Sequence, residues 1–461
     1  MGRDLILKMR KNKTNEYQSF LQGKRHLAGE FGFDPVFMPD SAFPFQRDLI
    51  EWAVRKGRAA LFADCGMGKT LMQLAWAKNV SIKTGGKVLI LTPLAVSHQT
   101  VTEAHKFGID AERSNEGKIN SQIVVTNYER LHHFNPDDFC GVVCDESSIL
   151  KNFAGSTRIA ITEFMKHAKY RLLCTATAAP NDYIELGTSS EAIGVMQRKH
   201  MLSRFFTHDG GDTSSWRLKG HTRSRLFWEW MASWARAIRK PSDLGYKDGR
   251  FILPDLHRRM HVVESPADGE YLFSMPAVGL AEQRSERKRT IQQRCEMAAE
   301  ISSSHSDPVI CWCSLNAEGD LLEKLIPDAI QVSGSDSDEL KEEKFSAFET
   351  GDARVIVTKP TIAGFGLNWQ HCAHQTFFPS HSFEQWYQAI RRSWRFGQDR
   401  PVTIDVITSE GEQRVMASID RKTRQAEQMF SELVSHMGIQ SATKHLTINI
   451  NNQPEIIPSW L

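Results

Sequence analysis

The sequence has few cysteines, and their spacing forms no Cys-x-x-Cys pair. Of the eight, five lie inside apolar segments, namely Cys140, Cys144, Cys174, Cys311 and Cys313. Without paired spacing, the sequence predicts neither a disulfide framework nor a structural zinc site. We therefore expect reduced thiols and a cytoplasmic location.

Long apolar runs are also missing. Nothing approaches the roughly 18 to 20 residues needed to span a bilayer, and Met1-Gly-Arg-Asp-Leu-Ile6 lacks the apolar core of a signal peptide. A hydrophobic content of 41% and a charged content of 24% are ordinary for a globular protein. We expect no contact with a membrane.

The length of the chain indicates more than one domain, and its positive charge is concentrated in one stretch. A chain of 461 residues is long for a single core, so two domains with an insertion are expected. The net charge is only +2, yet residues 198–259 hold 14 Lys/Arg against 6 Asp/Glu. Concentrated positive charge suits a phosphate backbone, because binding releases counterions. A solvated surface would have the same composition, and charge alone does not decide between the two.

Short apolar segments alternate with longer mixed segments from Phe43 onward, which is typical of parallel α/β units. The strands that we predict are residues 59–63, 88–94, 123–126, 141–144, 171–175, 309–313, 330–332, 355–358, 375–378 and 402–407. The alternation lapses between Tyr183 and Asp307. We expect an N-terminal extension (1–38), a first lobe (39–185), a helical basic insertion (186–304), a second lobe (305–440) and a tail (441–461).

Three smaller predictions concern the ends and the insertion. A helix is expected near residues 16–27, and a long helix over 281–301. Alternation of Leu446, Ile448 and Ile450 predicts an added edge strand in the tail. The tryptophans at positions 228, 230 and 234 are near-helical in spacing, which favours a buried seam over stacking on nucleic-acid bases.

A glycine-containing loop lies between a predicted strand and a predicted helix. It reads Ala63-Asp-Cys-Gly-Met-Gly-Lys-Thr70. Backbone N–H groups of such a loop cradle phosphates, the lysine reaches the β- and γ-phosphates, and the threonine hydroxyl binds Mg²⁺. The nucleotide-binding residues that we predict here are Cys65, Gly66, Met67, Gly68, Lys69 and Thr70.

An acidic pair, Asp145 and Glu146, follows a later apolar strand. Asp145 would hold Mg²⁺ and Glu146 would activate water. The alternative, a pair that only caps the next helix through its dipole, is disfavoured by the loop upstream. Gln46, shortly before the first strand, offers a donor and an acceptor side by side, which matches the adenine edge.

The segment from Gln388 to Gln398 contains Arg392 and Arg395. Their spacing of three places them on one face if the segment is helical. An arginine brought to the γ-phosphate when two lobes close accelerates phosphoryl transfer by about 10³ to 10⁵. A basic helix face paired with acids such as Glu384 is the alternative, and we favour the catalytic role.

Together these residues resemble superfamily-two helicases, and within them the Swi/Snf-like branch, especially the short versions of phages and bacterial mobile elements. The resemblance covers roughly residues 43–407 and lies in the order of its motifs: Phe45-Gln-Arg47, the glycine loop, Leu91-Thr-Pro-Leu94, Val125-Thr-Asn-Tyr128, Asp145-Glu-Ser-Ser148, Cys174-Thr-Ala-Thr177, Thr358 to Asn368 and Gln388 to Gln398. Arg239 to Leu244 and Leu253-Pro254 also match this branch. Ser147-Ser148 and Trp394 depart from its usual pattern, as does Cys65.

The resemblance implies two tandem RecA-like lobes that bind ATP and Mg²⁺ between them. It implies catalytic roles for Lys69, Asp145, Glu146, Gln388, Arg392 and Arg395, a nucleotide contact at Gly366, and coupling through Thr175 and Thr177. The implied nucleic-acid contacts are Thr92, Pro93, Thr126, Asn127, Tyr128, Thr358, Lys359, Gly364 and Asn368. The basic stretch adds Arg217, Lys219, Arg223 and Arg225 as candidates.

The function that this implies is ATP-dependent translocation on duplex DNA by a monomeric motor, in phage-like replication, recombination or repair with partner proteins of those processes. Three alternatives stay open: a strand-separating helicase, an RNA-dependent ATPase, and a DNA-binding scaffold without catalysis. The intact Lys69, Asp145 and Glu146 argue against the last.

Overall fold

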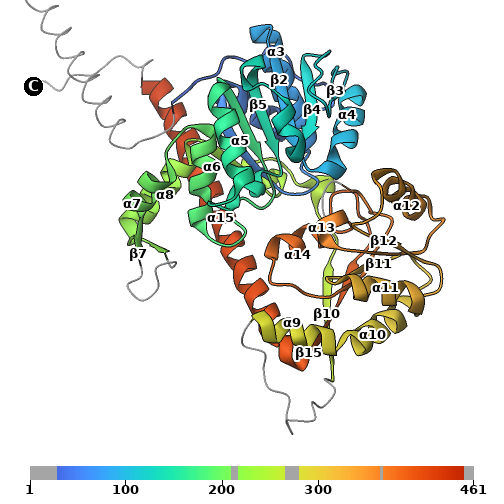
Figure 1. Cartoon of the computed structure of the whole chain (residues 1–461). Helices are drawn as coiled ribbons and strands as arrows, with labels where there is room; N and C mark the ends of the chain where they lie inside the picture. Colours follow the sequence, from blue (N-terminus) through green and yellow to red (C-terminus); the bar gives the residue numbers. More distant parts are fainter. Residues whose placement is uncertain (1–28, 209–215, 265–279, 364–366, 451–461) are drawn as a thin grey trace, which may run out of the picture.

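The computed structural model describes residues 29–208, 216–264, 280–363 and 367–450. The helix predicted near residues 16–27 lies outside these ranges. The described part folds into two parallel-sheet lobes (Figure 1). None of its helices is both long and apolar enough to cross a membrane.

The first lobe has a seven-stranded parallel sheet in the order β3-β4-β2-β5-β6-β1-β9. Its strands are β1 (Arg58–Ala63), β2 (Lys87–Thr92), β3 (Glu112–Arg113), β4 (Ile123–Asn127), β5 (Phe139–Asp145), β6 (Tyr170–Cys174) and β9 (Ala235–Ile238). Its helices are α2 (Pro44–Lys56), α3 (Lys69–Thr84), α4 (Ser97–Lys106), α5 (Ser156–His167), α6 (Leu186–Ile193), α7 (Arg198–Phe205) and α8 (His221–Ala232). A hairpin of β7 (Phe206–His208) and β8 (Trp216–Leu218) follows α7.

The second lobe has a six-stranded parallel sheet in the order β10-β15-β14-β11-β13-β12. Its strands are β10 (Leu256–Val263), β11 (Val309–Trp312), β12 (Ala329–Val332), β13 (Val355–Thr358), β14 (His374–Phe377) and β15 (Val402–Ser409). Its helices are α9 (Leu280–Arg289), α10 (Ile291–Ser303), α11 (Asn316–Leu325), α12 (Asp338–Thr350), α13 (Pro360–Ala363), α14 (Phe383–Ile390) and the start of α15 (Gln413–Ile450).

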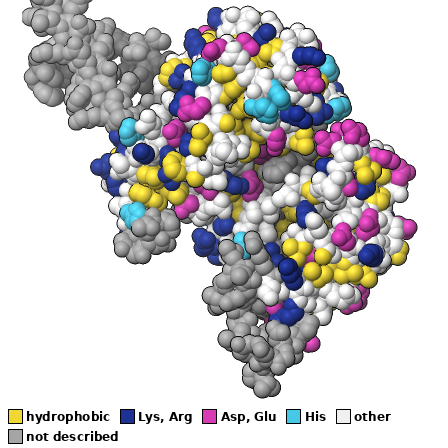
Figure 2. All heavy atoms as spheres, viewed as in Figure 1, with side chains coloured by type: hydrophobic (Ala, Val, Ile, Leu, Met, Phe, Trp, Pro, Cys, Tyr) yellow, Lys and Arg dark blue, Asp and Glu magenta, His cyan; other side chains and the backbone are white. Residues whose placement is uncertain are grey.

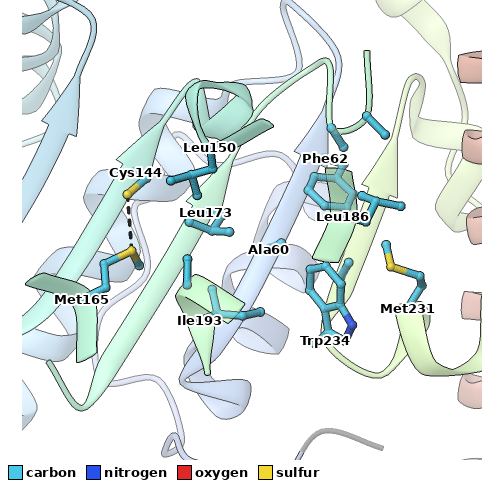
Figure 3. Close-up of a cluster of buried hydrophobic side chains, with 14 of the residues drawn as sticks. Ala60, Phe62, Cys144, Leu150, Met165, Leu173, Leu186, Ile193, Met231 and Trp234 are labelled. Atoms are coloured by element: carbon cyan, nitrogen blue, oxygen red, sulfur yellow. Dashed lines mark hydrogen bonds between the residues drawn. The ribbon is translucent and has the colours of Figure 1, made fainter. Parts of the chain in front are cut away.

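The central strands are apolar because both faces of each sheet are covered. In the first lobe, one core lies against α2 and α3, and the other lies against α5 to α8. Figure 3 shows part of the second core, where Phe62 from β1 packs near Trp234, which follows α8, and Leu173 from β6 lies between Leu150 and Ile193. Trp228, Trp230 and Trp234 are at most 2% exposed, which confirms the predicted buried seam.

The stretch predicted as an insertion divides differently in the structure. Residues 235–238 form β9, which pairs with β1 in the first sheet, and residues 256–263 form β10, which pairs with β15 in the second. Among the described residues of this stretch, α6 is buried in the first lobe and carries no Lys or Arg, whereas α7, α8 and the hairpin form its basic part. Residues 239–255 therefore carry the chain from one lobe to the other.

Two further predictions differ from the structure. The long helix expected over residues 281–301 is two helices, α9 and α10, which meet at Thr290. The edge strand expected around Leu446, Ile448 and Ile450 is wrong, because that backbone continues α15 as helix. A helix already running from Gln413 extends by adding one hydrogen bond per residue, whereas a new strand needs an exposed sheet edge beside it.

Helix α15 belongs to both lobes. At 38 residues it is about 57 Å long. Val415, Met416 and Ile419 pack in the second lobe, while Met429, Phe430, Leu433 and Met437 are buried against the first. In Figure 1 the helix leaves the second lobe near β15 and passes beside α8.

Candidate active site between the two lobes

The glycine loop joins β1 to α3. Gly66 and Gly68 have φ angles of 86° and 82°, a left-handed conformation that glycine adopts without steric cost. A Cβ atom at Gly66 would lie 2.8 Å from Cβ of Phe396, so a side chain there would also collide with the second lobe. Helix α3 begins at Lys69, and its N-terminal N–H groups and dipole favour a bound phosphate.

Lys69 is buried beside the acidic pair. Its Nζ donates to the Ala63 carbonyl at 3.2 Å. Burial alone would lower the pKa of Lys69, but electrostatic interaction with Cys65, Glu146 and Asp145 raises it above the usual value. The lysine therefore stays cationic next to the position where phosphate would bind.

Asp145 and Glu146 lie at the carboxyl end of β5, both at most 7% exposed. Burial raises the pKa of each carboxyl, although Lys69 opposes the shift. Glu146 adopts a left-handed backbone conformation, with φ 49° and ψ 52°, which is uncommon for a residue with a side chain. Strained backbone of this kind clusters at functional sites.

Partners of the acidic pair include two residues that the sequence did not single out for this role. Nε2 of Gln73 on α3 donates to Asp145 Oδ1 at 2.6 Å, and the Tyr128 hydroxyl donates to the Asp145 carbonyl. Thr175 donates to Glu146 Oε2 at 3.1 Å and accepts from the Thr177 N–H at 3.0 Å. Of the two predicted coupling residues, Thr175 thus contacts the predicted base directly, and Thr177 contacts Thr175.

The second lobe contributes α14 and the turn after it. Nε2 of Gln388 donates to Glu146 Oε2 at 3.4 Å, and Oε1 of Gln388 lies 3.8 Å from the Cys65 sulfur. Arg392 is held by its own lobe: Nε and Nη2 donate to Gln388, and Nη1 donates to the Leu367 carbonyl. Burial lowers the pKa of Arg392 to about 10, and Glu146 is one of the negative groups that oppose the shift.

Arg395 is the third predicted catalytic residue of the second lobe. Its Nη1 donates to the Leu367 carbonyl at 3.2 Å, whereas its buried Nε has no hydrogen-bond partner among the described residues. A buried donor without an acceptor is costly, and a phosphate oxygen would satisfy it. The residues present thus fit ATP with Mg²⁺, for which Thr70 and Asp145 are the candidate protein ligands.

Gln46 on α2 lies against the loop. Its Nε2 donates to the Met67 carbonyl at 2.9 Å, and its Oε1 accepts from the Phe43 N–H at 2.9 Å. One amide hydrogen is left after these two contacts. Adenine recognition by Gln46 stays a prediction that requires this hydrogen or a rearrangement of the amide.

The predicted nucleic-acid contacts fall into two groups. Thr92, Thr126, Asn127, Tyr128 and Thr358 have buried side chains, so any contact there would use backbone groups. Pro93 and Lys359 are half-buried and Asn368 is exposed; Lys359 donates to Asn316 Oδ1. Gly364 and Gly366 lie outside the described residues.

The basic candidates lie on β8 and α8. Arg217, Arg223 and Arg225 are exposed, although Arg225 pairs with Glu229 at 2.9 Å. Lys219 is half-buried, and its Nζ donates to the Ser203 carbonyl at 2.5 Å. Figure 2 shows Lys and Arg side chains together with hydrophobic ones over the region of α7 and α8.

Comparisons with known proteins agree with the first lobe's motifs. The family model described as DEAD/DEAH box helicase matches residues 43–186. No sequence among the curated proteins matches the chain. Among solved structures, the Sulfolobus solfataricus SWI2/SNF2 ATPase core in complex with dsDNA is similar, with 17% identity and a TM-score of 0.42, over 82% of this chain and 90% of that chain.

The sheets are as expected for two tandem RecA-like lobes, since each is parallel, and the glycine loop and Glu146 follow the carboxyl ends of β1 and β5. The similarity to DEAD/DEAH box helicases covers residues 43–186, which is less than half of the chain.

Proposed function

We propose that the chain is an ATP-dependent DNA translocase of the Swi/Snf-like type, which couples ATP hydrolysis to movement along duplex DNA. The observation that carries the proposal is the contact between lobes: Gln388 of the second lobe donates to Glu146 of the first. The arginines that follow Gln388 are thereby placed beside the glycine loop. Each lobe supplies groups that the other lacks, as an ATPase driven by lobe closure requires.

The roles follow from this geometry. The loop amides and Lys69 bind the phosphates, and Glu146 accepts a proton from the attacking water, whose position Gln388 helps to fix. Mg²⁺, when bound through Thr70 and Asp145, neutralises charge on the phosphates. Arg392 and Arg395 stabilise the charge that develops on the γ-phosphate. Opening of the lobes after hydrolysis then alternates their grip on the DNA backbone.

The preference for duplex DNA comes from the motif resemblance and from the exposed Arg217, Arg223 and Arg225. Contacts of this type position a strand without reading its sequence. A monomeric, cytoplasmic motor that acts in phage-like replication, recombination or repair is the context that we propose.

The test is ATP hydrolysis measured with duplex DNA, single-stranded DNA and RNA side by side. We expect the largest stimulation with duplex DNA, and no hydrolysis by Lys69→Ala with any of them. A stronger response to RNA would point to an RNA-dependent ATPase, and a stronger response to single strands to a strand-separating helicase. Phosphate release that is absent, or that Lys69→Ala leaves unchanged, would point to a scaffold.

A further inference from the structure

A buried ion pair joins the second lobe to the glycine loop itself. The guanidinium of Arg391, next to the predicted catalytic Arg392, contacts the carboxylate of Asp64, and the Tyr387 hydroxyl donates to the same carboxylate. The side chains of Arg391 and Asp64 are 8% and 4% exposed. Neither residue is among those assigned a role above.

Asp64 forms the first corner of the loop. Its Oδ1 accepts the Cys65 N–H at 2.6 Å, and its carbonyl accepts the Met67 N–H at 3.2 Å. Its own N–H donates to the Ile238 carbonyl of β9 at 2.9 Å. A force on the Asp64 carboxylate therefore acts directly on the backbone at Cys65, where the glycine loop begins.

Arg391 is fixed on its own lobe. Nη1 donates to the Trp394 carbonyl at 3.1 Å, and the guanidinium lies 4.4 Å from the centroid of the Trp394 ring. The Trp394 indole in turn donates to the Pro254 carbonyl at 2.7 Å, in the segment that links the lobes. An arginine clamped in this way loses little further freedom when it binds a carboxylate.

The positive charge of Arg391 is maintained despite burial. Burial alone would lower the pKa of Arg391, but Asp64 and Tyr387 more than offset this and raise it above the usual value. A buried ion pair contributes little net stability relative to an apolar pair, because desolvation is costly. Its directionality, with three donors on one carboxylate, suits fixing one lobe against the other.

We propose that Arg391 is a positioning residue, which aligns the glycine loop with Arg392 and Arg395 by holding Asp64 across the lobe boundary. The inference rests on the proposed ATP hydrolysis. When the lobes close, the segment after α14 brings Arg392 and Arg395 toward the γ-phosphate and brings Arg391 to Asp64 at the start of the loop. The loop amides and the two catalytic arginines are then correctly placed relative to each other. The contact between Arg391 and Asp64 forms without nucleotide.

The first test compares Arg391→Met with Arg400→Met, a matched change at an arginine of the same lobe that is 43% exposed and pairs with Asp307. We expect Arg391→Met to lower kcat by about 10 to 100-fold, as small misalignment of reacting groups does, with a smaller change in KM. Arg391→Lys should recover part of kcat. An Arg391→Met variant with the kcat of the control would overturn the proposal.

Hydrogen exchange in the absence of nucleotide provides a second readout. Arg391→Met should speed exchange of the amides at residues 64–68 while those of β1 stay protected. If Arg391 only stabilises its own lobe, exchange would rise around α14 and not in the loop, and the proposal would be wrong. This measurement does not require hydrolysis, so its result is separable from a failure of the proposed function, which wild type without ATPase activity would reveal.

A double-mutant cycle tests whether Arg391 acts through Asp64. In the Asp64→Asn background, Arg391→Met should reduce kcat much less than it does in the wild type, because the partner charge is already gone. Independent, additive reductions would overturn the assignment. Thermal unfolding of each variant verifies that the protein is folded.

Discussion

Glu146 is a buried carboxylate, and ionising it in the native state lowers the stability of the protein by a measurable amount. Its pKa is raised, so the native state binds more protons than the unfolded state between the ordinary carboxyl pKa and the raised one. Stability therefore falls as pH rises through that window. Above it, the ionised side chain destabilises the nucleotide-free protein.

We expect Glu146→Gln to raise the Tm of the nucleotide-free protein by a few degrees at pH 7 and to abolish ATP hydrolysis. The gain in Tm should disappear below the ordinary carboxyl pKa of about 4.3, where the wild-type side chain is protonated in both states. Thermal unfolding at a series of pH values measures this. A variant less stable than the wild type at pH 7 would contradict it.

Arg392 and Arg395 are held differently, which separates their variants. Changing either to Ala should lower kcat by about 10³-fold or more. Arg392→Ala should also lower the Tm, because three hydrogen bonds within the lobe are lost, whereas Arg395→Ala should leave it nearly unchanged. Single-turnover hydrolysis and thermal unfolding test the pair, and equal effects on the Tm would argue against this distinction.

At the scale of single residues, the sequence predicted those site residues that lie in a recognisable local motif. Lys69, Asp145, Glu146 and Arg392 were expected together, and the structure brings them to one boundary between the lobes. Gln73, Asp64 and Arg391 were not assigned roles, because their partners lie on other elements and only packing reveals them. An aspartate two residues before Gly66 was the available signal.

Among the elements, buried parallel strands were the most predictable. The ten expected strands correspond to β1, β2, β4 to β6 and β11 to β15, since each is a short run of apolar residues. β3 and β7 to β10 were missed. β3, β7 and β8 have only two or three residues, β9 contains an arginine among its four residues, and β10 carries exposed charged side chains with no apolar alternation. Its pairing with β15 joins residues that lie far apart in the sequence, such as Leu256 and Val402.

The hairpin and α8 lead to a prediction about DNA binding. Replacing Arg217, Arg223 and Arg225 with Ala should weaken duplex binding and make its salt dependence shallower, by about 0.9 in log–log slope per lost phosphate contact. Lys118→Ala, at an 82%-exposed side chain of the first lobe, is the control. Binding measured over a salt series tests this, and an unchanged slope would mean that the arginines form only a solvated surface.

At the scale of the whole molecule, α15 is the largest departure from expectation. Its sequence alone did not indicate that one helix would be shared by two cores, since each half reads as an ordinary amphipathic segment. The structure places Leu433 in the first lobe's core although it follows the second lobe in the chain. Domain boundaries drawn along the sequence could not show that the chain returns to the first lobe in α15.

We expect Leu433→Ala to destabilise the first lobe by about 2 to 5 kcal/mol, the usual range for a buried Leu. Denaturant unfolding monitored by the tryptophan seam of that lobe measures the change. Ile419→Ala, at the same helix but within the second lobe's core, is the comparison and should leave the first lobe's transition less affected. Equal effects of both substitutions on that transition would mean that the helix unfolds with the two lobes as one unit.

The linking segment of residues 239–255 and helix α15 both connect the two lobes, and they contact each other at one place. Arg239, at the start of the linking segment, donates to the Ala426 carbonyl in the first half of α15 at 3.1 Å, and its guanidinium lies over the Phe430 ring. Because the linking segment and α15 are joined at this point, we expect the two lobes to rotate about a single axis and to resist sliding and twisting relative to each other. Each round of opening would then retrace the same arc, which gives a motor a stroke of defined direction and length.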